Sequence, residues 1–80
     1  MPYLNTKDRW AMDQGEPCDT PGELNYKFTR LCQQYIKDKG EKYQYYNDII
    51  GALEACKLEL YRRAVSTYED TKVNENGDVF

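Results

Sequence analysis

Two adjacent arginines, Arg62 and Arg63, follow Tyr61 in the second half of this 80-residue chain. A guanidinium group donates paired hydrogen bonds to phosphate oxygens, and a tyrosine ring can stack on a base. If residues 43–68 form one helix, further polar side chains follow one edge of it. The sequence therefore predicts a site for a small phosphorylated or nucleotide-type ligand, made of Asn47, Glu54, Lys57, Tyr61, Arg62, Arg63 and Tyr68.

A purely structural role is the competing interpretation for each of these side chains. Glu54 lies three residues before Lys57, and Glu59 lies three and four residues before the arginines. Side chains at these spacings form surface ion pairs on a helix. The tyrosines, in turn, would form the rim of a helical core.

Catalysis and metal binding lack the residues they require. The chain has no His, and its three Cys include no CxxC pair. Glu54 and Glu59 are five residues apart, which places them about 140° apart around a helix, whereas a Mg²⁺ site needs carboxylates that converge. We therefore predict no catalytic residue, no metal, no cofactor and no enzymatic activity.

The first predicted helix, 21–39, has clear signals at both ends. Thr20 can accept a hydrogen bond from the first turn, Pro21 suits the first helical position, and Glu23 completes a capping box. Gly40 supplies the end of the helix.

The second predicted helix, 43–68, has two faces that can bury surface. One is an apolar stripe at helical spacing, and the other contains Gly51 and Ala55, small residues that let another backbone approach. A short link between the helices favours an antiparallel helical hairpin. Residues 1–19 are predicted as a packed arm, and 69–80 as a tail whose Val79 and Phe80 fold back. The apolar stripe comprises Tyr46, Ile49, Ile50, Leu53, Leu60 and Ala64.

The size of the chain predicts a single all-α domain that self-associates. A chain of this length buries only about 60% of its unfolded surface, and disulfides and metal are disfavoured as alternative stabilisers. We expect a helical bundle formed by a dimer or a larger homo-oligomer. The net charge of −3 disfavours duplex DNA as a partner, and the lack of an apolar leader or span predicts a cytoplasmic protein without membrane contact.

Several stretches together resemble a family of small uncharacterised proteins encoded by bacteriophages and some bacterial genomes. They are PGELNY at 21–26, NDIIGALEACKLELYRR at 47–63, YED at 68–70 and ENGDVF at 75–80. The resemblance implies a phage accessory protein in the cytoplasm of an infected host, with counter-defence as the expected role. We expect it to sequester its ligand without enzymatic activity; the alternative is an interaction protein that docks on a host protein and inhibits it.

Overall fold

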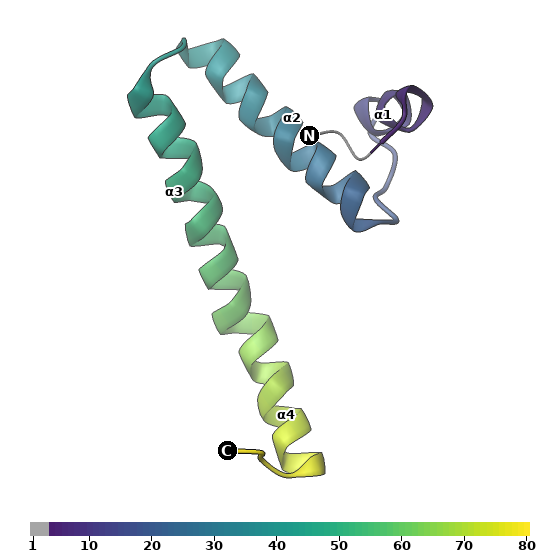
Figure 1. The fold of residues 1–80 in the computed structure, drawn as a ribbon, viewed down its shortest axis with the longest axis vertical. Helices are drawn as coiled ribbons and strands as arrows, with labels where there is room; N and C mark the ends of the chain where they lie inside the picture. Colours follow the sequence, from purple (N-terminus) through teal and green to yellow (C-terminus); the bar gives the residue numbers. More distant parts are fainter. Residues whose placement is uncertain (1–3) are drawn as a thin grey trace. The chain divides into compact units, whose positions relative to one another are not determined.

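The computed structural model describes residues 4–80, and these residues contain helices and no strands (Figure 1). The predicted all-α class is therefore confirmed for this part of the chain. Residues 1–3, at the start of the predicted arm, lie outside the described residues. The elements are α1 (Thr6–Asp13), α2 (Pro21–Lys39), α3 (Tyr43–Leu60), the π-helical turn η1 (Tyr61–Val65) and α4 (Ser66–Asn76).

The helix α1 lies within residues 1–19, which were predicted as a packed arm with no helix assigned to them. The Asn5 side chain accepts a hydrogen bond of 2.8 Å from the backbone N–H of Asp8, which caps the helix. Asp8 also places a negative charge in the first turn, where the helix dipole favours it. Because α1 is short and has no sustained apolar period, periodicity alone did not reveal it.

The helix α2 begins and ends at the predicted residues. The Thr20 hydroxyl accepts from the backbone N–H of Glu23 at 3.1 Å, and the Glu23 carboxylate accepts from the backbone N–H of Thr20 at 3.1 Å. These reciprocal bonds are the predicted capping box. At the other end, Gly40 has a φ of 103°, which residues with a Cβ rarely adopt.

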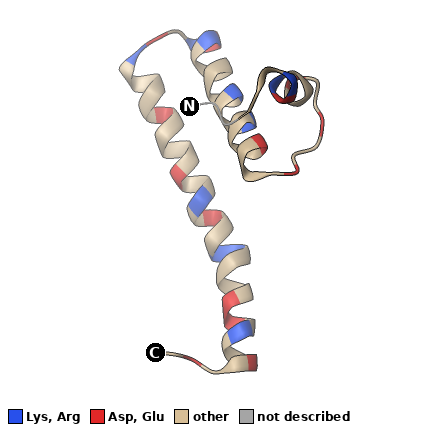
Figure 2. Cartoon of the chain, turned by 45° about the vertical axis from the view of Figure 1, so that its right-hand side comes forward, with Lys and Arg blue, Asp and Glu red and all other residues tan. Residues whose placement is uncertain are grey.

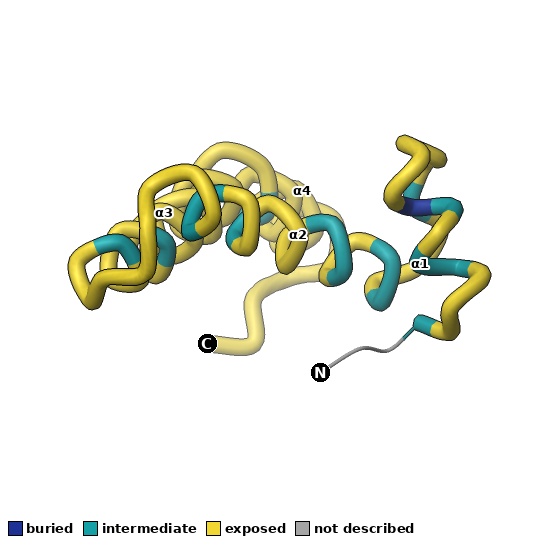
Figure 3. The backbone as a smooth tube through the Cα atoms, turned by 90° about the horizontal axis from the view of Figure 1, so that it is seen from above, coloured by how far each residue is buried: buried dark blue, intermediate teal, exposed yellow. Residues whose placement is uncertain are grey.

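The chain divides into two compact units, residues 1–46 and 47–80. In the first unit α1 packs against α2. Met12 of α1 is buried with 5% of its surface exposed, and its sulfur lies 3.9 Å from the Cys18 sulfur (Figure 3). The Lys27 ammonium of α2 donates to the Glu16 carbonyl at 2.6 Å. Packing and a charged hydrogen bond thus hold the segment after α1 to α2.

Three polar side chains form a second link between α1 and α2. The Tyr26 hydroxyl lies 2.9 Å from each carboxylate oxygen of Asp13, and Arg30 Nε donates to the Tyr26 oxygen at 2.7 Å. The hydrogen bond with Tyr26 raises the pKa of Arg30, and the Asp13 carboxylate raises it further. Arg30 therefore stays charged within this link.

In the second unit, the end of α3, η1 and α4 follow one another as a continuous helical segment (Figure 1). The backbone N–H of Ser66 donates to the carbonyl of Tyr61, five residues earlier, which gives this turn one more residue than an α-helical turn. The helical segment begins at Tyr43, the first residue predicted for it.

The predicted tail 69–80 is wrong for most of its length, because α4 continues to Asn76. The hydroxyls of Thr67 and Thr71 donate to backbone carbonyls four residues earlier, so both side chains form hydrogen bonds with the backbone of the same helical segment. The helix ends at Gly77, which has a φ of 85°. Val79 and Phe80 are fully exposed, which contradicts their predicted packing.

Large apolar side chains are exposed throughout the second unit. Ile50, Leu53 and Leu58 are among them, and no described residue of this unit is buried (Figure 3). A Cβ built at Gly51 would meet no described atom within 4 Å, so no close backbone approach is made there within the second unit. Met12 is the only buried residue among residues 4–80.

Candidate ligand-binding site

Arg62 and Arg63 lie in η1 and share one carboxylate. Arg62 Nη2 donates to Glu59 Oε1 at 3.0 Å, and Arg63 Nε donates to the same oxygen. The side chains of Arg62 and Arg63 are 68% and 71% exposed. Two guanidinium charges thus meet one carboxylate charge, and this group of three side chains has a net charge of +1.

Tyr61 contacts a different acid. Its hydroxyl donates to Glu69 Oε2 at 3.1 Å. This hydrogen bond raises the pKa of Tyr61, as do the charge of Glu69 and, to a lesser degree, burial. The phenol therefore remains protonated as a donor, and its hydroxyl is bonded to Glu69 rather than to the arginine pair.

The π-helical turn explains why Tyr61 and Glu69 meet. Residues eight apart in an α-helix lie about 80° from one another around the axis. The extra residue in η1 turns each following side chain back around the helix axis by about the angle of one residue. Glu69 therefore lies within about 20° of Tyr61. Sequence reasoning assumed an uninterrupted helix and did not predict this contact.

The other predicted site residues have local partners or lie at the start of the unit. Lys57 forms an ion pair of 3.2 Å with Glu54, and the Lys72 ammonium lies 5.5 Å from the centre of the Tyr68 ring. Asn47 is exposed on α3. From Glu54 onward, acidic and basic positions follow one another in turn along this helical segment (Figure 2). The seven residues form several small groups rather than one enclosed pocket.

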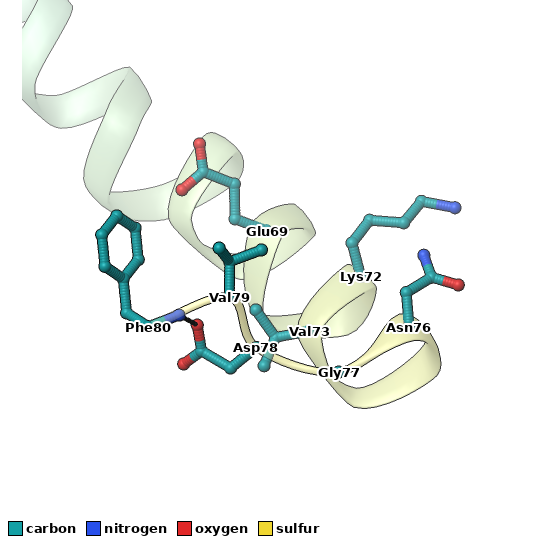
Figure 4. A pocket seen from close by; sticks show the side chains of 8 residues that line it. All are labelled: Glu69, Lys72, Val73, Asn76, Gly77, Asp78, Val79 and Phe80. Carbon is teal, nitrogen blue, oxygen red and sulfur yellow. Dashed lines mark hydrogen bonds between the residues drawn. The ribbon is translucent and has the colours of Figure 1, made fainter.

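A shallow hollow of about 420 Å³ lies elsewhere in the second unit, between α4 and the residues after it (Figure 4). Glu69, Lys72 and Val73 line it from the helix, and residues 77–80 line it from the other side. The backbone N–H of Phe80 donates to Asp78 at 2.9 Å, which bends this last segment. The hollow was not predicted, because residues 69–76 were not expected to be helical.

The described residues contain no group of three or more His, Cys, Asp or Glu side chains placed to hold a metal ion. Within residues 4–80 there is also no helix with both the length and the apolar character needed to cross a membrane.

The described residues form an all-helical structure, and the candidate site residues lie on its exposed helical surface. The chain belongs to the family DUF6899, a domain of unknown function, which matches residues 1–79. The resemblance to an uncharacterised family is confirmed at this level. No curated protein and no solved structure matches the chain.

Proposed function

We propose that this protein is a non-enzymatic, phage-encoded accessory protein that sequesters a compact phosphorylated ligand. It would act as a homo-oligomer in the cytoplasm of the infected bacterium, with counter-defence as its role. The observation that supports the ligand is the sharing of Glu59 by Arg62 and Arg63, which leaves one positive charge uncompensated in this group. The phage origin rests on the resemblance of the sequence motifs.

The arginine pair is suited to a small anion. Each guanidinium has five N–H donors, and the contacts to Glu59 use one donor from each arginine. The remaining donors can form charge-assisted hydrogen bonds with phosphate oxygens. Acidic side chains in α4, Glu69 and Asp70, would repel a long polyanion such as duplex DNA while leaving space for a compact ligand.

Calorimetric titration with linear and cyclic nucleotides tests this proposal. Replacing either Arg62 or Arg63 by Ala should weaken binding about ten- to a hundredfold, since a charge-assisted hydrogen bond contributes about 1.5 to 3 kcal/mol. Lys42→Ala, which removes an exposed positive charge from the first unit, is the matched control and should bind like the wild type. If no nucleotide binds the wild type below millimolar concentration, sequestration is wrong.

Docking on a host protein is the second candidate function. The observation that favours it is the set of exposed apolar side chains on α3, among them Ile50 and Leu58. Exposed large apolar side chains are typical of protein interaction sites where they gather in a patch. Leu58→Asp should abolish binding to an identified host target, whereas Lys42→Ala should not. Equal binding of the target by wild type and Leu58→Asp would exclude this surface.

We also infer that α2 and α3 form the predicted antiparallel hairpin. The stripe of α2 that contains Leu24, Phe28 and Leu31 is exposed, as is Leu53 of α3. Packing these two stripes together would remove apolar surface from water, at roughly 25 cal/mol for each Å² buried. Spin labels at Leu31→Cys and Leu53→Cys, with the native cysteines replaced by Ser, would report the separation of the helices.

A further inference from the structure

The π-helical turn changes which residues continue the apolar stripe of Leu60. In an uninterrupted α-helix the stripe would continue at Ala64 and Thr67, four and seven residues further on. The extra residue in η1 moves the stripe by one position, to Val65 and Tyr68. Leu60 and Tyr68 are 60% and 63% exposed. The turn therefore replaces small and polar positions by larger apolar ones on one face of the second unit.

The same turn aligns two opposite charges beside this stripe. Lys57 lies six residues before Arg63, and Glu69 lies six residues after it. Twelve residues of α-helix would separate their directions by about 120°, but the extra residue reduces this to about 20°. The hydrogen bond between Tyr61 and Glu69 agrees with this alignment, because Tyr61 is four residues after Lys57 and shares its side of the helix.

We propose that a second copy of this chain packs antiparallel on this stripe, with the twofold axis near Arg63. The proposal rests on the homo-oligomer of the proposed function and adds its partner, direction and register. Lys57 of each copy then faces Glu69 of the other, and Leu60 of each copy packs beside Val65 of the other. A parallel pair would instead place Lys57 against Lys57 and Glu69 against Glu69, which is repulsive.

Lys57 and Glu69 match in both distance and direction in an antiparallel pair, which is the self-complementarity that a twofold interface between identical chains requires. Glu54 and Lys72 lie nine residues before and after Arg63, but they do not repeat this match. Even with the extra residue of η1 taken into account, their directions around the helix differ by about 100°.

Within the second unit the stripe is open to a second copy, because Leu60 and Tyr68 are exposed there and no described residue of this unit is buried. Arg62, two residues after Leu60, lies about 160° from it around the helix and is bonded to Glu59, so this guanidinium stays accessible to a ligand.

Charge exchange in the full chain tests the direction and register. Sedimentation equilibrium should give a dimer dissociation constant about tenfold higher for Lys57→Glu and for Glu69→Lys, because each change makes two attractive pairs repulsive. The double variant should return to the wild-type value. Asp70→Lys is the matched control, because it makes the same charge change as Glu69→Lys at the next residue, whose side chain points away from the stripe. It should leave the dimer dissociation constant unchanged.

Zero-length cross-linking of an isotopically mixed sample provides a second readout. Lys57 and Glu69 of one chain are twelve residues apart, about 18 Å along the helix, so a cross-link between them must join two copies. Mixed-isotope Lys57–Glu69 cross-links are expected. A monomeric wild type, or single variants that dimerise like the wild type, would overturn the proposal. Nucleotide binding is measured separately by calorimetry. A chain that fails to dimerise in this register can therefore still bind nucleotide, and a chain that binds no nucleotide can still dimerise.

Discussion

At the scale of single residues, Tyr61 has the clearest consequence for pH. Its hydroxyl donates to Glu69, and the pKa of the phenol is raised above its ordinary value of 10.0 mainly by this hydrogen bond. A group with a raised pKa in the folded state adds stability below its ordinary pKa, and this stability is lost as pH rises through the raised value. The contact should therefore be intact at neutral pH and fail only in strongly alkaline solution.

We predict that Glu69→Gln lowers the pKa of Tyr61 towards 10, because an amide removes the negative charge that opposes ionisation. Ultraviolet absorbance of tyrosinate measures the titration, and Tyr61→Phe identifies which part of the signal belongs to this residue. Asp70→Asn, one residue along α4, is the control and should leave the titration in place. Identical titrations of the wild type and Glu69→Gln would contradict the Tyr61–Glu69 contact.

The candidate site illustrates how far residue spacing can predict contacts. The pairing of Glu59 with Arg62 and Arg63 follows from separations of three and four residues, and it is present. The partner of Tyr61 could not be predicted in this way, because it depends on the extra residue of η1. Nothing in the sequence Tyr-Arg-Arg-Ala-Val distinguishes a π-helical turn from an α-helical one.

At the scale of elements, capping residues determined which helices were predictable. Thr20 and Glu23 form reciprocal side-chain bonds with the backbone, and α2 begins where the sequence indicated. Asn5 caps α1 through a single bond to Asp8, a weaker signal that was not recognised. The end of the long helical segment was predicted too early, at residue 68, whereas Gly77 is the residue that ends it.

The cap of α2 allows a stability prediction. Thr20→Ala should lower the free energy of unfolding by about 1 kcal/mol, because it removes the acceptor for the Glu23 backbone N–H. Thr20→Asn should retain most of the stability, since Asn also caps helices well. Urea denaturation followed by circular dichroism measures both. If Thr20→Ala and Thr20→Asn unfold at the same urea concentration as the wild type, the capping bond contributes nothing to stability.

At the scale of the whole molecule, the large exposed apolar surface limits how much burial can contribute to the free energy of folding. Met12 is the one buried residue among residues 4–80, while Leu60 and other large apolar side chains are exposed. Small domains with so little core normally need additional stabilisation from covalent links, metals or partners. The cysteines are unpaired, and the described residues hold no metal cluster. The proposed antiparallel pairing would supply such stabilisation by burying part of this apolar surface.

Stability should accordingly depend on protein concentration. For a protein that folds as it dimerises, each tenfold rise in concentration adds about 1.4 kcal/mol to the stability of the assembly at 25 °C. A change of this size should raise the midpoint of thermal unfolding by several degrees in a chain of this length. Lys57→Glu should unfold at a lower temperature at every concentration, and the double exchange with Glu69→Lys should restore the wild-type curve. A midpoint that stays constant over a hundredfold range of concentration would show that the single chain is stable on its own, and the exposed stripe would then need no second copy.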